Sequence, residues 1–223
     1  MDVLKIVEQQ IEEIKKNVNV TSIILVGSMR NLEFDVKLND IDIFVITEEG
    51  SRQIRKILEV SGVEFDMNYF SKKVSEELIK KREQFFIECL KDGKLVYDRD
   101  GFGDYIIKES IREYNKGPDK MEDYEINNCI IKIDDYFKKL NKLQNGPKYE
   151  YHFLSNLCIK EMIKLYYRLN NIWVPKDKKL LKSLKKLNND LFSIVVDFYN
   201  EYDIEKLKEV FDYIIGENIQ KEM

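Results

Sequence analysis

Two aspartates, Asp40 and Asp42, open an apolar run that continues to Ile46. Residues two apart on a β-strand project from the same face, so both carboxylates would lie together while Ile41 and Ile43 enter the core. Two carboxylates this close repel each other unless a cation lies between them. Mg²⁺ is the expected cation, because it prefers oxygen ligands and shares them with nucleotide phosphates. The alternative is that both aspartates are exposed loop acids.

A glycine and a serine, Gly27 and Ser28, close the apolar run that precedes this pair of aspartates. Glycine adopts the positive φ that a tight exit from a strand needs, and without a β-carbon it lets a phosphate approach the backbone. Ser28 would cap a short helix whose free N–H groups favour anions. The pair therefore predicts a phosphate-binding turn.

A third carboxylate lies in an alternating stretch between residues 62 and 69. Apolar and polar side chains alternate there, in the order Val63, Glu64, Phe65, Asp66, Met67, Asn68 and Tyr69. This period predicts a half-buried strand with Asp66 on its polar face. A surface strand without any role in a site would show the same alternation, so both interpretations of Asp66 stay open.

These residues resemble the signature of a known superfamily. Gly27-Ser28, a gap of eleven residues and then Asp40-Ile41-Asp42 are similar to the pattern of the DNA polymerase β-like nucleotidyltransferases, which also carry a third carboxylate on a following strand. The resemblance implies transfer of a nucleoside monophosphate from ATP, or from another NTP, to an acceptor hydroxyl with release of pyrophosphate.

The same resemblance implies a role for each site residue. Asp40 and Asp42 would hold two Mg²⁺ ions, one bridging the triphosphate and one lowering the pKa of the acceptor hydroxyl. Asp66 would complete the shell of the second ion or act as general base, and the two roles remain alternatives. Gly27 and Ser28 would contact the β- and γ-phosphates. Arg30 would either contact phosphate or brace the turn.

Composition and charge narrow the class of protein. The chain has 223 residues, 43% of them hydrophobic and 35% charged, and it has no apolar stretch long enough to span a bilayer. Its N-terminal residues favour an amphipathic helix over a signal peptide. Three widely spaced cysteines, Cys89, Cys129 and Cys158, are typical of buried free thiols in a reducing compartment. We therefore expect a cytoplasmic protein that does not bind membranes.

The distribution of charge argues against a nucleic-acid partner. Residues 1–100 hold 16 Lys and Arg against 20 Asp and Glu, and residues 101–223 hold 21 of each kind. Neither half has the basic excess that binding to a phosphate backbone normally demands. An acidic catalytic half suits metal ions and a cationic acceptor better.

The pattern of elements predicts an α+β protein, with a small mixed-sheet nucleotidyltransferase domain followed by an all-α helical bundle. We expect helices near 2–17, 29–34, 51–60 and 72–91, and strands at 21–26, 41–46, around Asp66 and at 94–97. Strand patterns stop at about residue 100, where we place the boundary between domains 1–100 and 101–223. Later helices are expected at 102–115, 119–144, 148–170, 177–198 (with a break near 188–189) and 203–219.

This layout resembles the antibiotic nucleotidyltransferases that modify aminoglycosides or lincosamides. The resemblance implies antibiotic resistance, with AMP moved from ATP to a hydroxyl of a small, aminoglycoside-like molecule held by the helical domain at a cleft beside the catalytic domain. A homodimer is an open alternative to a monomer, because many such enzymes place the acceptor between subunits. Two other functions stay open, namely modification of a protein in the manner of antitoxin-type nucleotidyltransferases, and nucleotide binding without catalysis.

Overall fold

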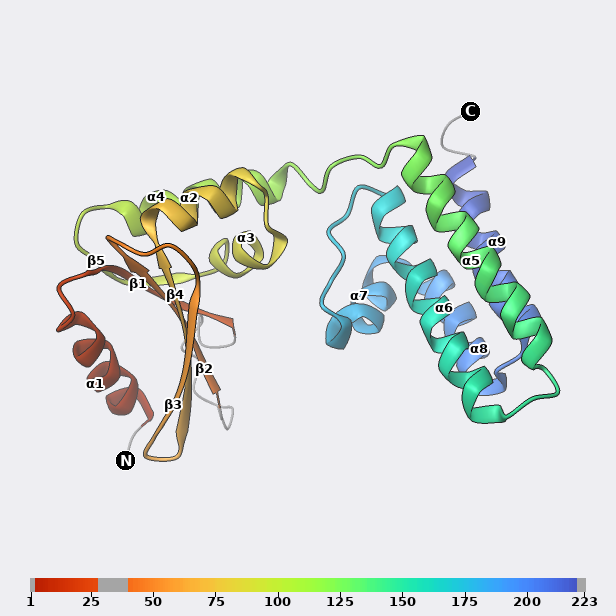
Figure 1. The fold of residues 1–223 in the computed structure, drawn as a ribbon, viewed down its shortest axis with the longest axis horizontal. Coiled ribbons are helices and arrows are strands. Elements are labelled where there is room, and N and C mark those ends of the chain that lie inside the picture. The colour runs from red at the N-terminus through yellow and green to blue at the C-terminus, as the bar shows by residue number, and fades with distance from the viewer. Residues whose placement is uncertain (1–2, 28–39, 220–223) are drawn as a thin grey trace. The chain divides into compact units, whose positions relative to one another are not determined.

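The computed structural model describes residues 3–27 and 40–219. It divides into two compact units, Met1–Lys116 and Gly117–Met223, which we call the sheet unit and the helical unit. Figure 1 shows the strands confined to the first unit and a set of long helices in the second. The predicted α+β class is therefore confirmed.

A five-stranded sheet forms the middle of the sheet unit, with the strand order β3-β4-β2-β1-β5. Its strands are β1 (Val20–Val26), β2 (Asp40–Thr47), β3 (Ile54–Val60), β4 (Val63–Ser71) and β5 (Lys94–Asp98). The central pair β2 and β4 is parallel, whereas the other neighbouring strands are antiparallel. The predicted strands at 21–26, 41–46, Asp66 and 94–97 all form.

One face of the sheet packs on helix α1 (Val3–Lys15). The buried stripe of this helix, which includes Ile6 and Ile11, shares a core with inward side chains of the strands such as Ile41, Ile43 and Phe65. Figure 1 shows α1 lying against this face. The alternation of the strands thus sends every second residue toward α1 and leaves the intervening residues on the opposite face.

An aromatic cluster covers part of that opposite face. Phe44 of β2 lies 5.0 Å from Phe70 of β4 and 5.9 Å from Phe86, measured between ring centroids. The surrounding helices are α2 (Lys72–Lys80), α3 (Gln84–Leu90) and α4 (Phe102–Asn115). Phe44 shares its face with Asp42, two residues earlier, so the cluster ends where the acidic ends of β2 and β4 begin.

The helix predicted at 51–60 is wrong, because this segment is the edge strand β3. Val60 pairs with Val63, and the two residues between them, Ser61 and Gly62, have φ values of 53° and 78°. Two successive positive φ values are the mark of a type I′ hairpin turn, whose twist matches that of paired strands. Ile54 and Ile57 happen to show helical spacing, but pairing with β4 decides the conformation.

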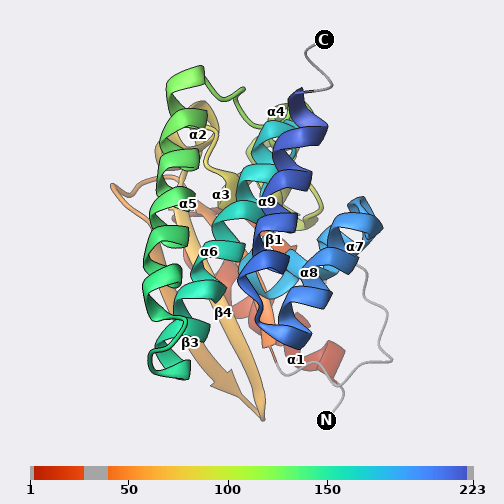
Figure 2. The ribbon, with the colours of Figure 1, turned by 90° about the vertical axis from the view of Figure 1, so that its right-hand side faces the viewer.

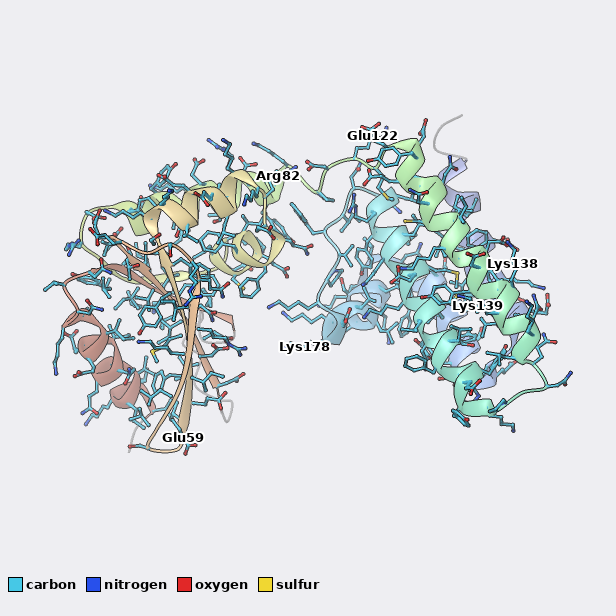
Figure 3. All side chains as sticks on the ribbon, in the orientation of Figure 1. Glu59, Arg82, Glu122, Lys138, Lys139 and Lys178 are labelled. Carbon is cyan, nitrogen blue, oxygen red and sulfur yellow. The ribbon has the colours of Figure 1, made fainter. Side chains whose placement is uncertain are left out.

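The helix predicted at 72–91 is interrupted after Lys80. Ser71 caps its start by accepting a hydrogen bond from the backbone N–H of Val74, at 3.2 Å. Arg82 then adopts a left-handed conformation with φ of 53°, which ends α2 before α3 begins. Its guanidinium lies 3.5 Å from the Glu113 carboxylate of α4, and Figure 3 labels Arg82 at this turn.

The two units divide at Lys116, and the predicted boundary after residue 100 is too early for the structural units. The reason is that α4 is fastened to the sheet. The Asp98 carboxylate, at the end of β5, accepts hydrogen bonds from the backbone N–H groups of Gly103 (3.1 Å) and Asp104 (3.0 Å), and from Ser22 Oγ of β1 (2.9 Å). A β-carbon at Gly103 would lie 2.8 Å from Ser22 Cβ, so only glycine allows this close packing.

The helical unit contains α5 (Asp123–Leu143), α6 (Lys148–Leu169), α7 (Leu180–Leu187), α8 (Asn189–Glu201) and α9 (Ile204–Ile219). Figure 2 shows α5, α6 and α9 side by side. The buried side of α6, including Met162 and Tyr167, joins Leu191 and Val195 of α8 in one core. The predicted break near 188–189 is present, and Asn188 caps α8 by accepting a hydrogen bond from the Leu191 N–H at 2.9 Å.

All three cysteines are free thiols, as predicted, but only Cys158 is fully buried. Burial raises the pKa of the Cys158 thiol to about 12. Cys89 and Cys129 are partly exposed. None of the described helices is both long and apolar enough to cross a membrane.

Candidate active site

Four carboxylates lie at the end of the sheet where β2 and β4 begin. The parallel register sets Asp40 beside Glu64 and Asp42 beside Asp66, and we call these four residues the acidic cluster. Neighbouring strands are about 4.8 Å apart, so the side chains of each pair are close neighbours on one face. Asp40 and Glu64 are exposed, whereas Asp42 and Asp66 are half-buried.

The fully buried Ile41 and Phe65 lie between these acids along the strands, and the fully buried Ile43 follows Asp42. They anchor the strands on the α1 side of the sheet. Asp40 and Asp42 therefore share a face of β2, as predicted, and Asp66 lies on a strand, also as predicted. The parallel pairing of β2 and β4 therefore brings Asp40, Asp42 and Asp66 close to one another.

Gly27 lies at the end of β1, against the side chain of Asp42. Its φ is +71°, and a β-carbon on this residue would collide with Asp42 Oδ2. Val26, one residue earlier, is the β1 partner of Asp42. Glycine is thus required at 27 both by the backbone conformation and by the carboxylate beside it.

Arg55 of the edge strand β3 reaches over the sheet to Asp66. Arg55 Nε donates to Asp66 Oδ1 at 2.8 Å, and Nη2 donates to Oδ2 at 2.7 Å. This two-point geometry is the strongest that a guanidinium and a carboxylate can form. Hydrogen bonding to Asp66 is the main cause that raises the pKa of Arg55, and the negative charges of Asp42 and Glu64 add to it.

Two amide side chains extend the contacts of Asp66. Asn68 Nδ2 lies 3.3 Å from Asp66 Oδ1, and Gln53 Nε2 donates to Asn68 Oδ1 at 2.7 Å. Asn68 lies on β4 two residues after Asp66, so both side chains project from the same face. Asp66 is consequently held from β3 and from its own strand.

Comparison with known proteins identifies the family of the chain. The family model described as "Nucleotidyltransferase domain" matches residues 7–218. The chain belongs to the nucleotidyltransferase domain family. Among solved structures, a nucleotidyltransferase-like protein from Exiguobacterium sibiricum 255-15 is similar, with 11% identity, a TM-score of 0.49, and coverage of 94% of this chain and 72% of that one. No curated protein matches the chain.

Membership of the nucleotidyltransferase domain family confirms part of the sequence prediction. It supports transfer of a nucleotide as the general activity. The likeness to antibiotic-modifying enzymes, the preference for ATP and the identity of the acceptor stay predictions. Two predicted phosphate-binding residues of this nucleotidyltransferase, Ser28 and Arg30, lie outside the described residues.

The donor chemistry of the acidic cluster fits a magnesium ion, because Mg²⁺ prefers carboxylate oxygens. The positions of these side chains, however, differ from those around a bound metal ion. Within residues 3–27 and 40–219, no three His, Cys, Asp or Glu side chains are grouped as they would be around a metal ion. Asp66, the predicted third ligand, instead gives both oxygens to Arg55. The predicted site carboxylates are thus near one another, and the Arg55 guanidinium pairs with one of them, Asp66.

Sequence reasoning missed Arg55, Asn68 and Gln53 as site residues. Gln53 and Arg55 lie in the segment 51–60 that was predicted as a helix. A helix there would not pair with the strand of Asp66. One signal was available, since Ser61-Gly62 between two apolar runs is a hairpin pattern. A hairpin there places Arg55 opposite Asn68.

Replacing Gly27 tests the packing of Asp42. We expect Gly27→Ala to lower nucleotidyl transfer by about tenfold to a hundredfold, since displacing a reacting group by about 1 Å can cost a hundredfold. The control is Gly101→Ala, because Gly101 also has a positive φ, of +83°, but no described atom lies within 4 Å of an added β-carbon. Urea titration should show a loss of stability in both variants, larger in Gly27→Ala because of the added contact with Asp42, and only Gly27→Ala should lose activity. Equal activities would contradict the prediction.

Proposed function

We propose that this protein is a Mg²⁺-dependent nucleotidyltransferase that transfers AMP from ATP to a hydroxyl of a small molecule. The observation that carries the proposal is the register of β2 and β4, which sets Asp42 beside Asp66 where the two strands begin. Membership of the nucleotidyltransferase domain family supports the general activity. The metal, the nucleotide and the acceptor are our proposals.

The residues of β2 would hold the metal. Asp40 and Asp42 are adjacent on one face of this strand, next to the turn at Gly27 that would receive the triphosphate. Bound Mg²⁺ supplies charge neutralisation at the phosphates and lowers the pKa of an acceptor hydroxyl. The hydroxyl oxygen forms a bond to the α-phosphorus, the bond from that phosphorus to the pyrophosphate oxygen breaks, and the hydroxyl proton is released to solvent.

The charge of the cluster favours a cationic acceptor. Asp40, Asp42, Glu64 and Asp66 carry four carboxylates, and Arg55 contacts one of them. A surface rich in one sign of charge attracts ligands of the opposite sign. Amino sugars of the aminoglycoside kind combine positive charge with several hydroxyls, so they are the first acceptors to test. We propose that the helical unit binds this acceptor.

The test is pyrophosphate release with Mg²⁺ and each of the four NTPs, against aminoglycosides, lincosamides and neutral sugars. Acceptor-dependent release with ATP, absent in Asp40→Asn, is the expected result. Label transferred from radioactive ATP to a polypeptide would instead show a protein acceptor. Tight binding of nucleotide without turnover in any combination would show a binding module, and either outcome would refute the small-molecule function.

A further inference from the structure

The ion pair between Arg55 and Asp66 occupies both oxygens of the carboxylate. The two donor distances, 2.8 and 2.7 Å, leave neither oxygen free of a guanidinium proton. Arg55 uses one of the two lone pairs on each oxygen, and its positive charge repels a metal ion that would bind through the other. Arg55 and a cation at this end of the sheet therefore compete for the same group.

The two partners of this pair differ in how firmly they are held. The side chain of Asp66 is 15% exposed, and its strand lies between β2 and β3 in the sheet. The side chain of Arg55 is 59% exposed, and it projects from an edge strand with β4 as its neighbour. The guanidinium can therefore leave Asp66 by rotation about its side-chain bonds, whereas the carboxylate stays in place.

The electrostatic surroundings give Arg55 the position of a counter-cation. Asp42, the register partner of Asp66, and Glu64, two residues earlier on β4, act on it in addition to Asp66. Without a positive charge, carboxylates at this spacing destabilise one another. Arg55 thus supplies inside the protein the neutralising charge that a divalent ion would otherwise bring.

We propose that Arg55 is a built-in substitute for the divalent cation, which holds Asp66 until Mg²⁺ displaces it and so sets the Mg²⁺ concentration at which the site fills. This inference rests on the proposed function, because it assumes that the acidic cluster is the metal site. Arg55 acts through Asp66 and is a positioning residue.

The experiment measures binding of Mg²⁺ alone, by isothermal titration calorimetry on the full chain without nucleotide. We expect Arg55→Gln to bind Mg²⁺ about five- to tenfold more tightly than the wild type, the factor that corresponds to losing one good ion pair. The matched control is Lys56→Gln. Lys56 carries the same charge on the same strand but lies over the Tyr69 ring on the other face, 5.2 Å from its centroid, so its loss should change the affinity less than about twofold.

A double-variant cycle shows whether the effect passes through Asp66. In an Asp66→Asn background, Arg55→Gln should no longer strengthen Mg²⁺ binding beyond the change that Lys56→Gln gives. A direct readout is the Arg55 Nε–H resonance, which hydrogen bonding to Asp66 should protect from exchange in the metal-free protein. Addition of Mg²⁺ should remove that protection. Arg55→Lys keeps the charge without the two-point contact, and should give an intermediate affinity.

Several results would overturn the inference. Equal Mg²⁺ affinities of Arg55→Gln and Lys56→Gln, weaker binding by Arg55→Gln, or no Mg²⁺ binding by any variant would each do so. Failure of the proposed function would give a different experimental result from failure of the competition between Arg55 and Mg²⁺. A protein that transfers no nucleotide, but binds Mg²⁺ more tightly as Arg55→Gln through Asp66, would refute the function and support the competition.

Discussion

Asp42→Asn should lower acceptor-dependent pyrophosphate release by about a thousandfold or more. Asp42 lies between Gly27 on one side and Asp66 on the other, so its carboxylate is the centre of the acidic cluster. An amide is neutral and has one oxygen in place of two, which removes both the charge and a ligand. Loss of a single group that stabilises transition-state charge already costs about a hundredfold to a thousandfold, and loss of a metal ligand adds to this.

The measurement is a comparison of steady-state rates at saturating Mg²⁺ for the wild type, Asp42→Asn and a matched control. Asp104→Asn makes the same chemical change on α4, where the carboxylate pairs with Lys108 at 2.6 Å on an exposed surface. An exposed pair of this kind contributes little, so the control should keep its full rate. Circular dichroism should show folded protein in all three samples. A rate for Asp42→Asn within threefold of the wild type would exclude Asp42 from the metal site.

Phe44→Ala should destabilise the sheet unit by about 3–5 kcal/mol, the usual cost of removing a buried phenylalanine. Phe44 is 1% exposed, and its ring contacts those of Phe70, Phe86 and, at 5.8 Å, Phe85. These rings join the central strands to α3. A domain of ordinary stability has about 5–15 kcal/mol in total, so this variant loses a large part of it.

Urea titration of the full chain measures this effect. The chain has two units, each with its own core. The lower stability of Phe44→Ala should therefore move the unfolding transition of the sheet unit to a lower urea concentration and leave that of the helical unit unchanged. Phe153→Ala is the control, since Phe153 is 67% exposed on α6. A shift shared equally by both transitions would mean that the two units unfold as one.

The strand period alone predicted the faces of Asp40, Asp42 and Asp66, because alternation depends on residues next to one another in the chain. Arg55 could not be assigned in this way. Its contact with Asp66 depends on the pairing of β3 with β4, while its own segment shows an apolar spacing compatible with a helix. The hairpin turn at Ser61 and Gly62 favours a strand over a helix for this segment, but only if the turn signal is given more importance than the apolar spacing.

The end of the first unit was misjudged for a related reason. Asp98 and Gly101 are typical of a turn that closes a domain, and they do end β5. The Asp98 side chain, however, bonds the first turn of α4, and Gly103 lets that helix approach Ser22. Helix α4 therefore completes the first unit. The contact between Gly103 and Ser22 joins residues far apart in the chain, and composition does not predict it.

The parallel register of β2 and β4 limits where this chain can change its length. An extra residue at the exposed Ser51 and Arg52, in the connection between β2 and β3, would enlarge a surface loop. An extra residue between Val63 and Asp66 would exchange the two faces of β4 at its start, and would send a carboxylate toward α1 and Phe65 toward solvent. Insertions and deletions among homologues should accordingly collect outside the strands, while the spacing from the hairpin turn to Asp66 stays constant.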